Sequence, residues 1–447
     1  MIWVASAICI LNGVLHYFSN GRRMMNIGCV ISGWWGFILL INAYSPYDWY
    51  PLNDTTDIVI MLISISIVIG TFSRNSIVIG QERCILNNKM VLGVERDDIG
   101  SLFWIVQYVL IILLIPMVIR AFIILQNNSF SMYYLRTAYA NGASEGSFMN
   151  TFERMFYIHY IVGPFCNAFT IIDMIICFSN KFWKKPFICA VLMVVLRTIY
   201  TGGRTLIFMM LLIIVVVFSV YKNLSNNIIE EKSIKSKTRK PAIIMIILLG
   251  TITVARNNTD SNPFFEIIQT LIQYFGAGIR VLNSILLTPD HYGFNGYTYG
   301  SVTFAGLLSI FRTIDIYFFK PLGIGLFPLN FDPYSISQGY VATNIHYGTS
   351  SYMNAFPTMA YYFLRDGGYV GLVLLTVVFL KICSRKERRY YRTRSLFNAF
   401  LYILLFYVVI MSVCWWEPVN VEFWMELFWG YFICRAIVHK NITALRH

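Results

Sequence analysis

The sequence has few charged residues: Asp, Glu, Lys and Arg make up 13% of its 447 residues, whereas hydrophobic residues make up 57%. Soluble globular domains carry about twice that share of charged residues, at ~25%. The mean hydropathy of +0.61 also lies far outside the range of such domains. These values exclude a soluble protein and predict a polytopic membrane protein.

Several signatures of chemistry are missing as well. The nine cysteines form no CxxC pair and mostly lie within apolar runs, which predicts small buried side chains rather than metal ligands. There is no phosphate-binding P-loop, no HExxH motif and no pair of aspartates in a predicted outward loop. We therefore expect no metal and no cofactor. The net charge of +13 lies in short loops, so it indicates membrane topology rather than nucleic-acid binding.

What the sequence does contain is a series of apolar runs, each roughly long enough for a helix to cross a hydrocarbon core of ~30 Å. They predict an all-α polytopic membrane protein with about 11 transmembrane helices. The predicted spans are residues 1–18, 27–43, 58–72, 102–125, 158–178, 187–200, 205–221, 241–255, 369–383, 397–415 and 421–438.

Positive charge predicts the orientation of these spans. Segments 222–240 and 384–394 each carry six Lys or Arg, and the basic turns near Arg22 and Lys184 fall on the same side. The positive-inside rule makes that side cytoplasmic. The N-terminus is then external and the C-terminus cytoplasmic.

The same topology divides the chain into three parts: residues 1–255 form an N-terminal transmembrane bundle, 256–368 a large extracytoplasmic loop and 369–447 the C-terminal transmembrane helices. Long loops of this kind are usually functional. Segments 264–286 and 304–318 within the loop each keep an apolar face. They predict short helices lying in the membrane interface, although a hairpin dipping into the membrane would give the same topology.

Arginines gather at the predicted outer surface. In the stretch LRTIYTGGRTLIF, Arg197 lies about one turn inside the outer end of its span, and Arg204 opens the next span. The others predicted at or near this level are Arg120, Arg256, Arg280, Arg312 and Arg365. A planar guanidinium donates two parallel hydrogen bonds to phosphate and keeps its proton, so these arginines are candidates for binding a diphosphate. The alternative is that each one snorkels to lipid headgroups.

Candidate bases are scarce in the outward loop. It contains two histidines, His346 in NIHYGTSS and His291 in PDHYGFNG, and a neutral imidazole can take a proton from a sugar hydroxyl. Asp366 in LRDGG has a similar claim, whereas Asp173 lies near the middle of a span, where packing explains it at least as well. We take His346 and Asp366 as candidate catalytic residues and place His291 with the substrate-binding arginines. A packed or hydrogen-bonded histidine is the alternative.

The chain resembles the Wzy-type polymerases of bacterial oligosaccharide repeat units, which are related to the O-antigen ligases. The resemblance is carried by the glycines and arginines from Arg197 to Arg204, by the large late outward loop and by NAFPTMAYYFLRDGGYVGLVLL, which runs from Asn354 to Leu375. It covers the architecture of almost the whole chain.

This resemblance implies a glycosyltransferase at the outer face of the bacterial inner (cytoplasmic) membrane. It would move a growing chain from undecaprenyl diphosphate to the non-reducing sugar of an incoming lipid-linked repeat unit. Arg197 and Arg204 would hold the diphosphate, with Arg280 and Arg312 as further candidates. In the related ligases a histidine of the large loop is proposed to activate the acceptor, and His346 would be its nearest counterpart here. The expected partners are lipid-linked oligosaccharide, membrane lipids, a flippase and a chain-length regulator, without nucleic acid.

Two other functions stay open. An O-antigen ligase would use the same donor and differ only in its acceptor, and the sequence does not separate the two. A flippase for lipid-linked sugars would be expected to show two similar halves and charges in a central cavity. The chain has no obvious internal repeat, and its unexplained charges are predicted to lie outward.

Overall fold

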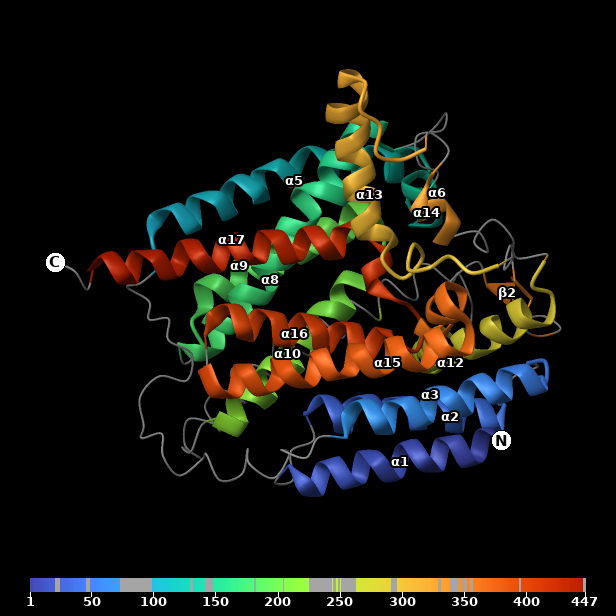
Figure 1. The fold of residues 1–447 in the computed structure, drawn as a ribbon. Coiled ribbons are helices and arrows are strands. Elements are labelled where there is room, and N and C mark those ends of the chain that lie inside the picture. Colours follow the sequence, from blue (N-terminus) through green and yellow to red (C-terminus); the bar gives the residue numbers. More distant parts are fainter. Residues whose placement is uncertain are drawn as a thin grey trace. The chain divides into compact units, whose positions relative to one another are not determined.

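The computed structural model describes residues 1–20, 25–45, 49–72, 99–128, 132–140, 148–180, 182–203, 205–224, 243, 247, 250, 263–290, 296–328, 331–337, 345–346, 348, 352–353, 357–393 and 395–444. Most of these residues lie in helices, and the strands among them form one short antiparallel pair (Figure 1). The prediction of an all-α protein is confirmed.

The chain forms two compact units, each built from three stretches of sequence. Unit 1 comprises Met1–Asn87, Thr270–Arg388 and Val408–Trp424, and unit 2 comprises Asn88–Gln269, Arg389–Tyr407 and Met425–His447. The three-part division predicted at residues 1–255, 256–368 and 369–447 follows the expected membrane topology, and it stays a prediction.

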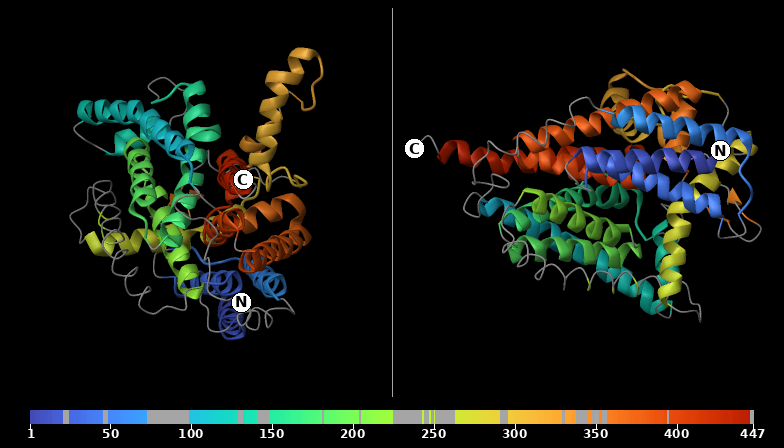
Figure 2. Two further views of the ribbon diagram at one scale, coloured as in Figure 1. Left: turned by 90° about the vertical axis from the view of Figure 1, so that its left-hand side faces the viewer. Right: turned by 90° about the horizontal axis from the view of Figure 1, so that it is seen from below.

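In unit 1 three N-terminal helices lie side by side (Figures 1 and 2): α1 (Ile2–Ser19), α2 (Ile27–Tyr44) and α3 (Asp54–Thr71). Glycines let α1 approach α2 closely, because a Cβ on Gly13 would lie 3.1 Å from the backbone nitrogen of Gly33. Asn12 Nδ2 on α1 donates a hydrogen bond to Ser32 Oγ on α2 at 2.8 Å. Small residues and buried polar contacts of this kind are typical of helices packed within membranes.

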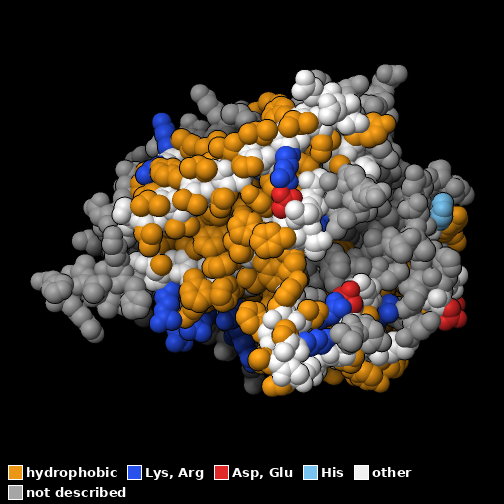
Figure 3. Space-filling view, turned by 90° about the horizontal axis from the view of Figure 1, so that it is seen from above, with side chains coloured by type: hydrophobic (Ala, Val, Ile, Leu, Met, Phe, Trp, Pro, Cys, Tyr) orange, Lys and Arg blue, Asp and Glu red, His pale blue; other side chains and the backbone are white. Residues whose placement is uncertain are grey.

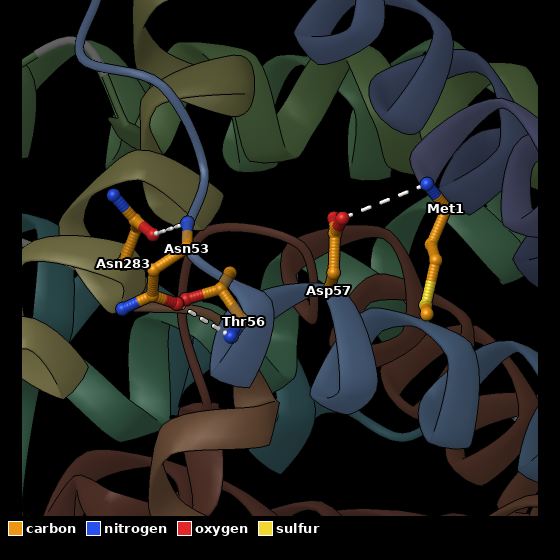
Figure 4. Close-up of polar contacts among 5 residues, drawn as sticks. All are labelled: Met1, Asn53, Thr56, Asp57 and Asn283. Carbon is orange, nitrogen blue, oxygen red and sulfur yellow. Dashed lines mark hydrogen bonds and ion pairs between the residues drawn. The ribbon is translucent and has the colours of Figure 1, made fainter.

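Two asparagines fix the start of α3 (Figure 4). The Asn53 side chain caps the helix by accepting a hydrogen bond from the backbone N–H of Thr56 at 2.6 Å. Its own backbone N–H donates to Asn283 Oδ1 at 2.9 Å. Asn283 lies on α12 (Pro263–Leu287), so this cap joins α3 to α12. In the first turn of α3, Asp57 lies 3.5 Å from the amino group of Met1.

The rest of the predicted outward loop in unit 1 contains short elements. They are α13 (Ala305–Ile314), the π-helix η4 (Asp315–Phe319), the 3₁₀ turn η5 (Lys320–Leu322), α14 (Pro333–Ser337), β1 (Ile345–His346) and β2 (Tyr352–Met353). The strands pair Ile345 with Met353. Helices thus occupy both segments, 264–286 and 304–318, for which the sequence predicts them. Their position relative to a membrane stays a prediction.

Helix α15 (Met359–Thr393) begins before the span predicted at residues 369–383 and contains a kink. Gly367 and Gly368 have non-helical backbone angles, and the φ of Gly368 is +61°, in the left-handed region that favours glycine. A Cβ on Gly368 would also lie 2.9 Å from the Tyr297 hydroxyl. The two glycines therefore allow the first turns of α15 to pack against the segment that starts near Tyr297.

Unit 2 contains α5 (Ser101–Asn127), α6 (Met132–Ala140), α7 (Thr151–Arg154), the π-helix η3 (Met155–Tyr160), α8 (Val162–Ser179), α9 (Lys184–Thr201) and α10 (Thr205–Leu224). Parts of α16 (Leu396–Met411) and α17 (Val421–Ala444) complete it. α8 is almost wholly buried and packs against α5, α9 and α10. It forms the centre of this unit.

Six helices among the described residues are long and apolar enough to cross a membrane: Ile2–Ser19, Ile27–Tyr44, Asp54–Thr71, Ser101–Asn127, Thr151–Ser179 and Met359–Thr393. Shorter apolar helices lie at Thr205–Ser219, Ile272–Leu287 and Leu396–Met411. Apolar side chains also cover much of the described surface in Figure 3. These features support a membrane protein. The predicted count of 11 spans is not confirmed by them and stays a prediction.

Candidate functional site

The most informative of the predicted site residues is Arg197, in the last turns of α9 in unit 2. The helix ends at Gly202, whose φ of +58° is left-handed, and Arg197 is only 8% exposed. Its Nη1 donates to Asn167 Oδ1 on α8, and the Tyr200 hydroxyl lies within hydrogen-bonding reach. Its Nε is buried and has no acceptor in the described part of the chain. A buried, charged donor without an acceptor is costly, so this atom points to a ligand.

A glycine makes room for the Arg197 guanidinium. A Cβ on Gly163 would lie 2.6 Å from the carbonyl oxygen of Ile158 and 3.3 Å from Arg197 Nη2. Ile158 belongs to η3, a six-residue π-helix immediately before α8. Single π-helical turns are rare and are often found at functional sites. Gly163 therefore allows this turn and the guanidinium to meet at the start of α8.

Helix α17 completes the surroundings of Arg197. Asn167 Nδ2 donates to Glu426 Oε2 on α17 at 3.3 Å, and Glu426 is 5% exposed. Trp429, one turn further along α17, donates from Nε1 to the carbonyl of Tyr160 at 2.9 Å. Its ring also packs on Phe165 with 4.5 Å between centroids. The three helices α8, α9 and α17 thus converge on one partly buried hydrogen-bonded chain.

Two further arginines of unit 2 lie next to this chain, around Tyr139 on α6. The guanidinium carbons of Arg136 and Arg154 are 5.4 and 6.0 Å from the centre of the Tyr139 ring, and Arg154 Nη1 donates to the Tyr139 carbonyl at 3.1 Å. Tyr139 in turn packs on Tyr200 at 6.3 Å. The backbone nitrogen and Cβ of Arg136 would lie 3.6 Å from a Cβ built on Gly202, so α6 packs near the turn that ends α9. We call Arg136, Arg154 and Arg197 the arginine cluster.

The arginine cluster keeps a positive charge. Within the described residues, none of its three members forms an ion pair with a carboxylate. The neighbouring Arg120 differs, because its Nη1 lies 2.7 Å from Glu153 Oε1. Glu153 is further used in the capping box at the start of α7, where Asn150 is the partner. The cluster is therefore suited to an anion, and Arg120 is already neutralised.

The predicted residues of unit 1 have different surroundings. Asp366 is 4% exposed and accepts hydrogen bonds from the Thr298 hydroxyl and from the backbone N–H groups of Val302 at 3.2 Å and Thr303 at 2.7 Å. Arg365 Nη1 donates to the Tyr361 hydroxyl at 2.9 Å. Asp366 thus holds the turn before α13 against the kink of α15. These hydrogen bonds indicate that the Asp366 carboxylate has a structural role rather than facing a substrate.

Arg280 on α12 is also held by the protein itself. Its Nε donates to Asn42 Oδ1 at 2.9 Å, its Nη2 to the Asn42 carbonyl and its Nη1 to the Tyr50 carbonyl. The guanidinium lies 5.5 Å from the Trp49 ring. Burial lowers the pKa of Arg280 to about 10, so the side chain keeps its charge at neutral pH. Its contacts tie α12 to α2 and to the segment that follows α2.

The remaining predicted residues do not form one group in the described structure. His346 lies in β1 with an exposed side chain, and its carbonyl accepts a hydrogen bond from Ser284 Oγ at 2.8 Å. Arg312 on α13 pairs with Asp332 at 3.1 Å. Arg204 and His291 lie outside the described residues.

Sequence reasoning missed Arg136, Arg154, Asn167 and Glu426. A signal existed for Glu426, because an acidic residue inside an apolar span needs a partner. Arg136 and Arg154 lie in a loop predicted to face outward, where arginines are unremarkable until their neighbours are known. Among the described residues, no three His, Cys, Asp or Glu side chains are grouped as a metal site requires.

Comparisons of this chain with family models, curated proteins and solved structures find no match.

Proposed function

We propose that this protein is a membrane glycosyltransferase that polymerises undecaprenyl-diphosphate-linked oligosaccharide repeat units into surface polysaccharide. The observation that carries the proposal is the buried Arg197, whose Nε has no acceptor in the described part of the chain. Its neighbour Tyr200 packs on Tyr139, the residue around which Arg136 and Arg154 lie. A diphosphate supplies several charged oxygens to such a cluster, and arginine binds them with directed hydrogen bonds. The resemblance to Wzy-type polymerases indicates that this diphosphate is the one in undecaprenyl diphosphate, the lipid carrier of the repeat units.

The proposed topology of 11 spans places the arginine cluster at the outer face of the bacterial inner membrane. On that topology the spans at 158–178 and 421–438 begin outside, and the span at 187–200 ends outside. Glu426 and Arg197 are near two of those ends, and Asn167, near the middle of the span at 158–178, joins them in one hydrogen-bonded chain. This agreement supports the relative directions of the spans at 187–200 and 421–438. It also supports the view that the cluster meets a lipid diphosphate at its headgroup.

The proposed reaction breaks the bond between the anomeric carbon of the donor sugar and its diphosphate oxygen, and forms a bond to an acceptor hydroxyl. Negative charge develops on the departing diphosphate, and arginines fixed in place stabilise that charge best where water is scarce. The hydroxyl proton passes to a base. His346 stays a candidate base because its side chain is exposed, whereas the oxygens of Asp366 already accept three hydrogen bonds from the protein.

A complementation experiment tests the proposal. In cells from which the gene is deleted, wild-type protein should restore long polysaccharide chains, whereas Arg197→Ala should not, with equal amounts of both proteins in the membrane. Arg435→Ala is the matched control, because Arg435 is an exposed arginine on α17 whose described hydrogen bond goes to Tyr431. Normal chains made by Arg197→Ala would exclude this arginine from diphosphate binding.

The same deletion separates the polymerase from an O-antigen ligase, which would use the same donor and the same arginine cluster. Loss of a polymerase leaves surface lipid carrying a single repeat unit. Loss of a ligase leaves finished polymer on its lipid carrier. Accumulation of lipid-linked polymer would therefore replace the proposed activity by ligation, while keeping the diphosphate site.

A further inference from the structure

Glu426 is a buried acid whose position needs a physical reason. It lies in an apolar helix and is 5% exposed. Burying a carboxylate costs free energy unless hydrogen bonds or charges compensate it. Its described contact is with Asn167 Nδ2, and Asn167 Oδ1 in turn accepts a hydrogen bond from Arg197. The acid is therefore coupled to the arginine through one amide.

This order of groups determines how Asn167 is oriented. An ionised carboxylate only accepts hydrogen bonds and a guanidinium only donates them. An amide placed between the two can satisfy both in one orientation, with its NH₂ toward Glu426 and its oxygen toward Arg197. Glu426 thereby excludes the flipped amide, in which the NH₂ of Asn167 would face the donors of Arg197.

The oriented amide in turn determines which part of Arg197 is free. Asn167 binds Nη1, the Tyr200 hydroxyl lies within hydrogen-bonding reach, and Nη2 lies 3.3 Å from the place that a Cβ on Gly163 would take. Within the described part of the chain, Nε is the guanidinium nitrogen left without an acceptor. A carboxylate at position 167 would pair directly with Arg197 and neutralise it. The amide holds the guanidinium while keeping its charge for an anion, and it places the acid one residue farther away.

We propose that Glu426 is a positioning residue of the anion site: it orients Asn167, which holds the Arg197 guanidinium with Nε directed to a phosphate oxygen. The inference rests on the proposed function, because it takes a phosphate-containing ligand for Arg197. It also gives α17 a role in the site, since Trp429 fixes the same stretch of this helix against η3.

Binding of inorganic pyrophosphate to the purified full-length protein in lipid nanodiscs tests the proposal by titration calorimetry. Glu426→Ala should weaken binding roughly tenfold, as expected when a hydrogen bond to a charged group loses its geometry. Glu426→Gln should stay within about threefold of wild type, because its amide oxygen can still accept from Asn167. Glu422→Ala is the control: it removes an acid four residues earlier on the same helix.

Kinetics separate positioning from chemistry and from a purely structural role. For a positioning residue, Glu426→Ala should raise KM for the lipid-linked donor, and Glu426→Gln should restore it. A lower kcat in Glu426→Gln with unchanged KM would instead make Glu426 a base and overturn the proposal. Unchanged pyrophosphate affinity in Glu426→Ala would overturn it as well.

Two further variants cover the case in which Glu426→Ala does not fold and test the proposed function separately. If Glu426→Ala does not fold, Asn167→Asp takes its place: it should pair with Arg197 and abolish pyrophosphate binding, and wild-type binding by this variant would overturn the proposal. Arg197→Ala tests the proposed function itself. If Arg197→Ala keeps full affinity, the anion site is wrong. If it loses affinity while Glu426→Ala does not, only the positioning role is wrong.

Discussion

Arg280 in unit 1 and Arg197 in unit 2 are both buried arginines on helices, yet their donors are used in opposite ways. Arg280 is 4% exposed, and its Nε, Nη1 and Nη2 all donate to oxygens of Asn42 and Tyr50. Arg197 is 8% exposed, and its Nε has no acceptor in the described part of the chain. Burial alone therefore does not mark a binding arginine. The unused Nε is what distinguishes Arg197 from Arg280.

The difference also separates stability from binding. An arginine that satisfies backbone carbonyls stabilises the fold, because its removal leaves those acceptors without their donor. Arg197 is held by the side-chain oxygens of Asn167 and Tyr200, so it contributes less to the fold and keeps its unused Nε for a ligand. Substituting each arginine should thus give opposite results in a stability measurement and in a binding measurement.

The largest stability effect is expected for Arg280→Ala. Two backbone carbonyls and the Asn42 side-chain oxygen would lose their donor, at about 1–3 kcal/mol each, so the loss should reach about 3 kcal/mol or more. Thermal unfolding of the purified protein measures it. Arg312→Ala is the control, because a partly exposed ion pair with Asp332 contributes no more than about 1 kcal/mol.

An opposite result for Arg280 would break the comparison. If Arg280→Ala unfolded at the wild-type temperature but no longer bound pyrophosphate, the sequence-based assignment of Arg280 to substrate binding would be right. The structural role inferred from its three hydrogen bonds would then be wrong.

A smaller effect, directed at the arginine cluster, is expected for Gly163→Ala. Alanine normally favours a helix, but here its Cβ would lie 2.6 Å from the Ile158 carbonyl and 3.3 Å from Arg197 Nη2. Overpacking of this kind costs about 1–3 kcal/mol, and it should displace the guanidinium and weaken pyrophosphate binding. Gly33→Ala in α2 is the matched control, because nothing lies within 4 Å of its added Cβ. Equal behaviour of the two variants would show that the close approach at Gly163 is unimportant.

The fold was predictable where one apolar run corresponds to one helix. The runs at 27–43 and 158–178 match α2 and α8 closely, because a helix that buries its own backbone hydrogen bonds needs only length and hydrophobicity. The kink in α15 was less visible. The adjacent glycines, Gly367 and Gly368, are compatible with a kink. The helical turns before them are held by hydrogen bonds from Thr298 and Thr303 to Asp366, and these two residues are distant in sequence from α15.

The site was predictable only in part, for the same reason. Arg197 could be identified because a permanent charge in an apolar run needs an explanation. The sequence did not show whether the Arg197 guanidinium contacts lipid, protein or a ligand. Its contacts depend on Asn167, which lies 30 residues earlier, and on Glu426, which lies in the last helix. From the sequence, Arg280 was a further candidate for the same ligand as Arg197. Only the hydrogen bonds to Asn42 and Tyr50 separate them, and no pattern in the sequence encodes those contacts.

The smallest effect is expected for Asp173→Asn, which extends the comparison to a buried acid. Asp173 is fully buried on α8, and Oδ1 accepts a hydrogen bond from Gln107 Nε2 at 2.7 Å. Asparagine keeps an oxygen for Gln107 and removes a potential charge from the interior, so stability should change by less than about 1 kcal/mol. Asp173→Ala leaves Gln107 without its acceptor and should cost about 1–3 kcal/mol in thermal unfolding. Normal stability of Asp173→Asn together with lost polymer formation would instead show that the carboxyl group takes part in function, and Asp173 would then belong with Arg197 rather than with Arg280.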